Sequence, residues 1–186
     1  MNNILVTSDL HLYHDREFVY KPRGFNSIDE MNEAILENWN KTVDNSDIVY
    51  ILGDIMLNDN DKGMELFNKL NGIFYIIRGN HDTDTRVNLY ESCEKVRSVK
   101  YADMIKYKGY HFFMTHYPCM TGNLEKESLK QCTLNLFGHT HQKTNFYQDM
   151  PFMYHVGMDS HNCTPVLIDD IIEEMNEKVE ECKRML

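Results

Sequence analysis

Three short apolar segments alternate with two helical segments in the first 80 residues, and this order constrains the fold more than any other feature. The apolar segments cover 3–7, 47–52 and 73–78 and contain mostly β-branched and aromatic residues. Such runs are typical of strands that are covered on both faces in a parallel sheet. Helices are predicted over 28–43, where Ser27 begins a capping-box pattern, and over 61–70. The alternation predicts an α/β fold.

The second half of the chain has a different pattern. Apolar runs on both sides of Lys108-Gly109 predict a β-hairpin. Four further strands and two helices are predicted, the strands at 133–137, 144–147, 152–156 and 165–168 and the helices at 124–131 and 169–186. We therefore expect a mostly parallel half and a mostly antiparallel half, packed as two sheets with helices outside. The length suits a single domain over 1–186.

Charge and cysteine content narrow the class of protein. The formal net charge is −10, and an acidic surface repels nucleic acid at long range, so a nucleic-acid partner is disfavoured. Bound divalent ions would offset this charge locally, so a small phosphorylated substrate remains compatible with it. The five cysteines form no CxxC pair and are odd in number, which argues against a disulfide framework. With no membrane-length apolar run and no signal-peptide pattern, we expect a cytoplasmic protein without membrane contact.

Side chains that bind metals follow the predicted strands directly. They occur in five places: Asp9 to His11, Asp54, Asn80 to Asp82, His116, and His139 to His141. Each one alone would pass as a turn former or a surface histidine. Because the carboxyl ends of strands in an open α/β sheet form the ligand crevice, all five segments would meet at one rim. Their coincidence favours a shared site.

The donor types in these segments suit divalent metal ions. Imidazole, carboxylate and amide oxygen together favour ions such as Zn, Mn, Fe, Co or Ni. No thiolate belongs to the set, which excludes a structural zinc site of the cysteine type. Seven residues are too many for one ion but suit two ions if one carboxylate bridges them: Asp9, His11, Asp54, Asn80, His116, His139 and His141. Two ions about 3.5–4 Å apart can hold a hydroxide and stabilise the attacking and leaving oxygens of a phosphoester.

The order of these motifs resembles that of the calcineurin-like metallophosphoesterase superfamily. The motifs are D-x-H at 9–11, G-D at 53–54, G-N-H-D at 79–82, a histidine at 116 and G-H-x-H at 138–141. They span most of the chain, which is similar to small bacterial and phage-type members. The resemblance implies a four-layer αββα sandwich of two mixed sheets flanked by helices.

The resemblance also implies roles for the matching residues. Asp9, His11 and His141 would hold the first metal ion, Asn80, His116 and His139 the second, and Asp54 would bridge the two. The remaining implied roles concern the substrate. Asn80 and His81 would contact the phosphate, His81 would protonate the leaving oxygen, and Asp82 would orient His81.

Several nearby residues have open roles. Arg23 is a candidate phosphate contact, with a solvated loop cation as the equal alternative. His14 is a candidate for lining the same rim as the metal-binding residues. Arg78 is expected to pair with nearby carboxylates rather than with phosphate. The remaining histidines without a motif are expected to be structural or exposed: His111, His155 and His161.

The expected activity is phosphoester hydrolysis by in-line attack of a metal-bridging hydroxide. A phosphodiesterase acting on small substrates is favoured, because little chain remains to build a long binding groove. A phosphatase is the close alternative, and a nuclease is a third possibility that the acidic charge disfavours. A non-catalytic scaffold, like the retromer-associated relative in this superfamily, is expected to lose ligands or the catalytic histidine. This chain retains all seven ligand positions and His81.

Overall fold

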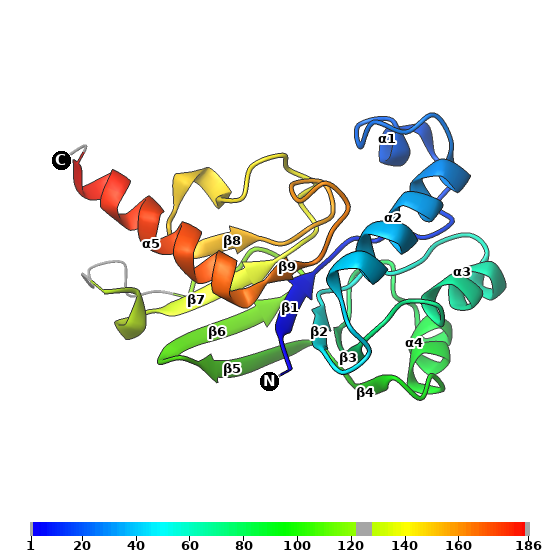
Figure 1. Cartoon of the computed structure of the whole chain (residues 1–186), viewed down its shortest axis with the longest axis horizontal. Coiled ribbons are helices and arrows are strands. Elements are labelled where there is room, and N and C mark those ends of the chain that lie inside the picture. The colour runs from blue at the N-terminus through cyan, green and yellow to red at the C-terminus, as the bar shows by residue number, and fades with distance from the viewer. Residues whose placement is uncertain (1, 122–127, 185–186) are drawn as a thin grey trace.

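Two β-sheets and the helices that flank them make up the computed structural model, which describes residues 2–121 and 128–184 (Figure 1). The first sheet has the strand order β4-β3-β2-β1-β9, and the second has the order β5-β6-β7-β8. The expectation of an α/β fold with two mixed sheets flanked by helices is confirmed.

The first sheet is built from the apolar runs of the N-terminal half. Strands β1 (Ile4–Thr7), β2 (Ile48–Ile51) and β3 (Ile73–Ile77) pair in parallel, as predicted. Strand β4 (Val96–Lys100) extends the parallel part, and β9 (Val166–Leu167) pairs antiparallel with β1. The pattern missed β4, because this edge strand has three polar residues among its five and no fully buried side chain.

Helices α2 (Ile28–Thr42), α3 (Asn60–Phe67) and α4 (Asp84–Glu91) contribute to a core with one face of the first sheet. Ser27 caps α2 by accepting a hydrogen bond from the Glu30 backbone N–H. The Glu30 carboxylate accepts from the backbone of Asn26 rather than from that of Ser27, so the reciprocal bond of the capping box is displaced by one residue. Helix α4 was not predicted, because its apolar residues do not gather on one face.

The second sheet is less antiparallel than expected. Strands β5 (Ala102–Tyr107) and β6 (Tyr110–Thr115) form the predicted hairpin. However, β7 (Thr133–Phe137) pairs in parallel with β6, and β8 (Met153–His155) pairs in parallel with β7. The prediction of a mostly antiparallel half was therefore wrong. The segments that join these strands are long enough for crossover connections, which parallel pairing requires.

Several short elements also differ from prediction. No strand forms at 144–147, where the structure has a single bridge between Phe146 and Tyr154 and a 3-10 turn, η2 (Tyr147–Asp149). The predicted helix at 124–131 is represented by η1 (Leu129–Gln131), and residues 124–127 lie outside the described part. One further helical turn, α1 (Glu17–Tyr20), was not predicted.

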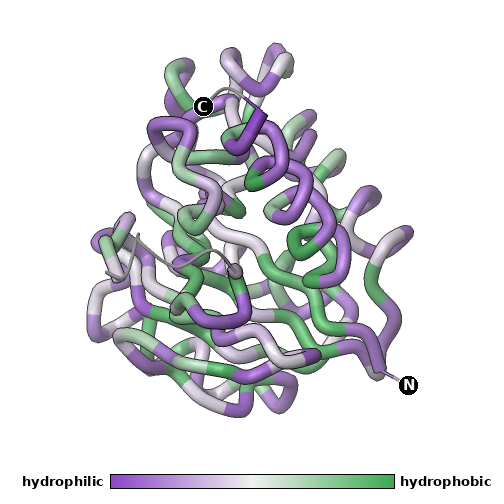
Figure 2. The backbone as a smooth tube through the Cα atoms, turned by 90° about the vertical axis from the view of Figure 1, so that its left-hand side faces the viewer, coloured by the Kyte–Doolittle hydropathy of each residue, from purple (hydrophilic) through white to green (hydrophobic). Residues whose placement is uncertain are grey.

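A second core fills the space between the sheets. It joins side chains of β1 to β3, such as Val6 and Tyr50, to those of β6 to β8, such as Phe112 and Leu136. Helix α5 (Ile168–Arg184) completes this core with Ile171 and its neighbours. In Figure 2 the green, hydrophobic residues gather in the interior strands, and much of the purple lies in the outer loops and helices. None of the described helices is both long and apolar enough to cross a membrane.

Two histidines without a motif are structural, as expected. His155 is fully buried, and its Nδ1 lies 2.8 Å from Ser160 Oγ. His161 Nε2 lies 2.9 Å from the His155 carbonyl oxygen, to which it can donate. Burial lowers the pKa of His155 from its ordinary 6.5 to about 4. His155 is therefore neutral in the folded protein at pH 7.

This low pKa predicts a loss of stability in acid. Between pH 6.5 and 4 the unfolded chain binds a proton at His155 that the folded protein does not, so the free energy of unfolding falls as pH falls. A shift of this size corresponds to about 3 kcal/mol. We expect His155→Gln to flatten the pH dependence of urea unfolding over this window, measured with chelator present. An unchanged slope in the variant would contradict this explanation.

Candidate metal centre

The candidate ligands lie in loops that follow the strands of both sheets, and five of them have an uncommon backbone conformation. Positive φ angles between 49° and 68° occur at Asp9, His11, Asp54, His139 and His141. Asp and His tolerate this left-handed region better than most residues, yet it remains sparsely populated. Such conformations cluster at functional sites because the surrounding structure holds them there.

The first group of ligand atoms comes from Asp9, His11 and His141, and these atoms lie within 4.8 Å of one another. His11 Nε2 is 3.7 Å from Asp9 Oδ1, and His141 Nε2 is 3.9 Å from the same oxygen. Both separations are too long for a hydrogen bond and leave space for a metal ion between the atoms. The three residues that the sequence assigns to the first ion are thus brought together.

Two atoms of this group are buried without a hydrogen-bond partner. Asp9 Oδ1 and His11 Nε2 are among the five such side-chain atoms in the described residues. Leaving buried polar atoms unpaired costs free energy, so each case needs an explanation. The other Asp9 oxygen is satisfied, because Oδ2 accepts from Ser8 Oγ at 2.7 Å and from the His139 backbone N–H at 2.8 Å. A divalent cation would satisfy both unpaired atoms.

The second group contains Asp9, Asp54 and His116. His116 Nδ1 lies 2.7 Å from the Leu52 carbonyl oxygen, which can only accept, so the proton of the neutral ring is on Nδ1. His116 Nε2 then turns its lone pair toward Asn80 Oδ1 at 2.8 Å and Asp54 Oδ2 at 3.5 Å. Three acceptors that face one another in this way repel unless a cation lies among them.

His139 completes the set of seven. Its ring centroid lies 5.0 Å from that of His116, which places it beside the second group, as the sequence suggested. The two groups share Asp9, whereas the sequence assigns the bridging role to Asp54. Asp54 lies within the same cluster, and its role as the bridge stays a prediction.

The charge states of these residues suit metal binding. Burial lowers the pKa values of His11 and His139, which keeps both rings neutral at pH 7 with a lone pair available. Burial alone would raise the pKa of Asp9, but the imidazoles of His11, His141 and His116 outweigh it and hold this pKa well below its usual range. Asp9 is therefore an anion, and the donor set fits divalent ions.

Arg23 does not reach toward a substrate, which corrects the prediction of a phosphate contact. Its side chain is only 1% exposed and forms two hydrogen bonds with Asp159, at 3.1 and 2.8 Å. The same guanidinium donates to the backbone carbonyls of Asp9 and Leu10, at 2.7 and 3.1 Å. Arg23 therefore holds the loop that carries the first motif.

Asp159 is a supporting residue that the sequence pattern missed. Its Oδ2 lies 2.8 Å from His141 Nδ1, and a carboxylate only accepts, so Nδ1 carries the proton. Burial alone would lower the pKa of His141, but the hydrogen bond to Asp159 and the charge of Asp9 raise it. In the neutral form of this ring the Nε2 lone pair is directed to the metal side. Carboxylates that orient metal-binding histidines in this way increase metal affinity. No local motif marks Asp159, because its partners are far away in the sequence.

His14 lies at the same rim. Its Nδ1 is 3.2 Å from His11 Nδ1, and its ring centroid is 6.2 Å from that of His81. The side chain is 8% exposed. Burial, with further contributions from His11, His81 and Arg16, lowers the pKa of His14 to about 4. His14 therefore packs against the cluster as a neutral ring.

Asp82 supports the site through the backbone rather than through the ring of His81. Its carboxylate accepts from the backbone N–H groups of Asp54 and Gly79, at 2.9 and 2.8 Å, and from Tyr90 Oη at 2.8 Å. The described contacts include no hydrogen bond from this carboxylate to the His81 ring, and the expectation that Asp82 orients His81 stays a prediction. Asp82 instead fixes the two loops that carry Asp54 and His81.

His81, in the third motif, has a ring that is partly open to solvent. Its side chain is 44% exposed, and Nε2 lies 3.9 Å from Asp54 Oδ2. Its backbone N–H donates to Asp54 Oδ1 at 2.8 Å. Arg78 pairs with Asp84 at 2.7 Å and donates to the Asp82 carbonyl at 2.6 Å, in line with its expected pairing role. His81 is therefore anchored by its backbone while its ring faces the open side.

Two glycines allow the loops to approach one another. A Cβ atom on Gly138 would overlap Ser8 Oγ and Asp9 Oδ2, and a Cβ atom on Gly79 would overlap Asp54 Oδ1. These glycines are required by close packing against metal-site carboxylates, in addition to their role in turns.

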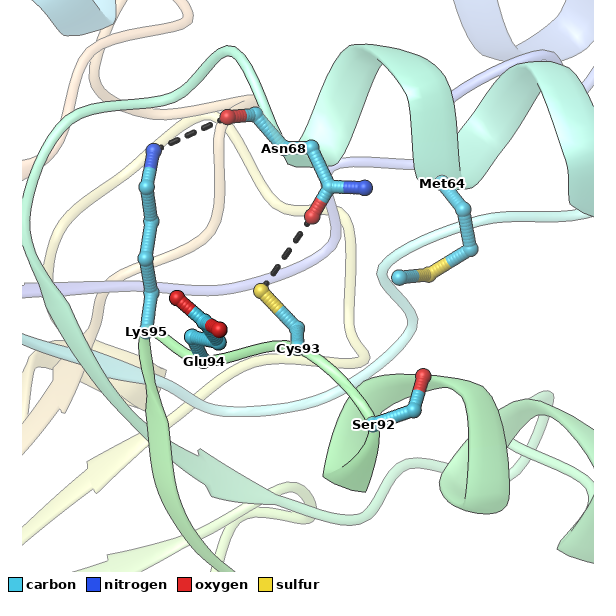
Figure 3. A pocket seen from close by; sticks show the side chains of 6 residues that line it. All are labelled: Met64, Asn68, Ser92, Cys93, Glu94 and Lys95. Carbon is cyan, nitrogen blue, oxygen red and sulfur yellow. Dashed lines mark hydrogen bonds between the residues drawn. The ribbon is translucent and has the colours of Figure 1, made fainter.

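A separate pocket lies beside the start of β4, the edge strand of the first sheet (Figure 3). It lies between the end of α3 and the turn after α4, and its polar groups bond one another. Cys93 Sγ lies 3.2 Å from Asn68 Oδ1, and Lys95 Nζ donates to the carbonyls of Asn68 and Leu70. This pocket is therefore stabilised internally and does not extend the metal centre.

Comparison with known proteins agrees with this geometry. Residues 2–158 match the model of the calcineurin-like phosphoesterase superfamily domain. An uncharacterized protein of Methanocaldococcus jannaschii is 34% identical, over 93% of this chain and 91% of its own length. The Gene 66 protein of Mycobacterium phage D29 is 26% identical, over 97% of this chain and 99% of its own.

The fold is also similar to that of a solved structure. A protein of unknown function from Aquifex aeolicus superposes with a TM-score of 0.71 at 21% identity, and the match covers 93% of this chain and 99% of the other. The class of protein that the fold and the ligand groups define is a metallophosphoesterase. The chain belongs to the calcineurin-like phosphoesterase superfamily.

The Asp159 contact predicts a selective loss of metal affinity. We expect Asp159→Asn to weaken binding of the first ion by roughly 10- to 100-fold, because His141 loses its charged partner. Calorimetric titration of the chelator-treated protein with Mn²⁺ measures this change. Asp169→Asn is the matched control, because Asp169 pairs with Lys108 on the surface. Equal Mn²⁺ affinity in both variants would contradict the role of Asp159.

Proposed function

We propose that this chain hydrolyses phosphoesters with two divalent metal ions bound at the candidate metal centre. The observation that carries the proposal is the pair of buried, unpartnered atoms Asp9 Oδ1 and His11 Nε2. The facing acceptors of His116, Asn80 and Asp54 support a second ion. Membership of the calcineurin-like phosphoesterase superfamily supports the hydrolase chemistry.

The residues divide into two sets in this proposal. Asp9, His11 and His141 would hold the first ion, and Asn80, His116 and His139 the second, with Asp54 between them. When bound, such ions lower the pKa of a coordinated water to about 7 and neutralise developing negative charge. The chain itself orients the donors: Asp159 fixes His141, the Leu52 carbonyl fixes His116, and Asp82 fixes the loop of Asp54.

His81 supplies the proton transfer. Its exposed ring lies next to Asp54 and His11, with ring centroids of His81 and His11 separated by 5.8 Å. A phosphoester bound at the cluster would place its leaving oxygen within reach of this ring. Donation of a proton from His81 to that oxygen makes it a better leaving group, an effect that contributes typically 10²- to 10⁴-fold.

Small phosphodiesters are the proposed substrates. The chain is short, and its net charge of −10 opposes a long polyanion. A phosphatase that acts on monoesters is the alternative within the same chemistry. The two are separated by comparing kcat/KM for bis(p-nitrophenyl) phosphate and for p-nitrophenyl phosphate in the presence of Mn, Zn, Fe, Co or Ni.

Removal of metal is expected to abolish turnover. Treatment with EDTA should stop hydrolysis of bis(p-nitrophenyl) phosphate, and added Mn²⁺ should restore it, because the ions held by Asp9 and its neighbours would activate the attacking water. Chelator-resistant turnover would overturn the proposed function. Faster hydrolysis of the monoester than of every diester would replace the phosphodiesterase assignment with a phosphatase.

Replacement of His81 separates catalysis from metal binding. We expect His81→Asn to lower kcat for bis(p-nitrophenyl) phosphate by 10²- to 10⁴-fold, while Mn²⁺ affinity measured by calorimetry stays unchanged. His111→Asn, on β6, is the control and should match the parent protein. A variant with full kcat would exclude His81 as the proton donor.

A further inference from the structure

The described residues include five large hydrophobic side chains that are more than half exposed: Phe18, Tyr101, Met104, Tyr117 and Met120. Single exposed hydrophobic residues are common and need no explanation. Phe18 and Tyr117 differ from the ordinary case because Tyr117 contacts the candidate ligands His116 and His139, and Phe18 contacts His14, which packs against the ligand cluster. The two rings contact different histidines and none in common.

Phe18 is connected to His81 through the ring of His14. Its ring meets the His14 ring edge-on, at a centroid distance of 5.6 Å and an angle of 89°. His14 in turn contacts the rings of His11 and His81 at 5.2 and 6.2 Å. The buried His14 ring thus links the exposed Phe18 ring, 72% accessible, to the proposed proton donor.

Tyr117 occupies the side of the second ligand group. Its ring centroid lies 4.6 Å from that of His139 and 5.1 Å from that of His116. Thr115 Oγ1 donates to the Tyr117 carbonyl at 2.7 Å, which fixes the backbone at this point. The ring is 51% exposed and available to a ligand.

Phe18 is held in place by its neighbours. The adjacent residues in α1, Val19 and Tyr20, are buried in the core at 5% and 8% exposure. Arg23, just after α1, is fixed to the first-motif loop and to Asp159. Figure 1 shows α1 beside the start of α2. The Phe18 ring is therefore presented from an anchored turn, which reduces the entropy cost of binding a ligand.

We propose that Phe18 is a stacking site for a planar aromatic group on the leaving side of the phosphoester, that is, in its leaving alcohol. Tyr117 contacts the other substituent of the phosphate. This inference rests on the proposed function, because the leaving side is defined by proton donation from His81. Stacking of one base on an aromatic side chain is sequence-tolerant and strong enough to change affinity by roughly tenfold or more. The substrate class is then a small diester that carries an aryl group or a nucleobase.

Kinetics with matched substrates tests the proposal. Methyl p-nitrophenyl phosphate carries a ring on the leaving side, and glycerol methyl phosphate carries none. We expect Phe18→Ala to raise KM for the first by roughly tenfold and to leave KM for the second unchanged. Met104→Ala removes a similarly exposed side chain from β5 and should change neither value. Equal changes for both substrates, or none, would overturn the stacking site.

A second variant separates stacking from simple apolar contact. Phe18→Leu keeps an apolar side chain without a ring, so stacking predicts that it behaves like Phe18→Ala. Restoration of the parent KM by Leu would overturn the aromatic site in favour of a general apolar one. Adenosine 5′-methyl phosphate distinguishes the two sources of the ring, because a nucleobase site predicts a lower KM for it than for the p-nitrophenyl diester.

Binding without turnover keeps this inference separate from the proposed function. If the parent protein hydrolyses no phosphoester, the proposed function fails. Calorimetry of the Mn²⁺-loaded protein with AMP and with ribose 5-phosphate still reports the ring site, because the two ligands differ only in the base. Roughly tenfold weaker binding of AMP to Phe18→Ala, with ribose 5-phosphate unaffected, supports the site. Equal affinity of AMP for the variant and the parent overturns it.

Discussion

The buried carboxylate of Asp9 is the point on which the site depends. One oxygen is held by Ser8 and by the backbone of His139, so the side chain has a fixed orientation. The other oxygen faces the imidazoles of His11 and His141 without a hydrogen bond. A buried anion with an unpaired oxygen is costly unless a positive charge lies next to it. Asp9, His11 and His141 all have positive φ angles in this arrangement. The proposed divalent ions would supply the missing positive charge.

Support for this carboxylate comes from parts of the chain that are distant in sequence. Arg23, from the segment after the first motif, binds the carbonyl of Asp9 and the carboxylate of Asp159 at once. Asp159 then orients His141, so one buried ion pair acts on two of the three residues of the first group, Asp9 and His141. Removing one member of a buried pair leaves an uncompensated charge, which is strongly destabilising. The first group is therefore sensitive to residues that touch neither metal nor substrate.

Local pattern was sufficient to predict the strands β1 to β3 and five of the candidate ligands, because apolar runs and the residues that follow them are adjacent in sequence. The candidates Asn80 and His116 depended more on the resemblance to the superfamily. Interactions between distant segments were not predictable in this way. The pairing of Arg23 with Asp159 spans 136 positions, and the parallel pairing of β6 with β7 depends on a crossover. The role of Asp82 was also missed, because its partners are backbone N–H groups that a sequence does not mark.

The most direct measurement is a crystal structure of the Mn²⁺-loaded protein with anomalous diffraction data collected near the metal edge. The account predicts two anomalous peaks about 3.5–4 Å apart. One peak should lie among Asp9, His11 and His141, and the other should lie near Asn80, His116 and His139. Peaks at other residues, or none at this rim under saturating Mn²⁺, would contradict the account.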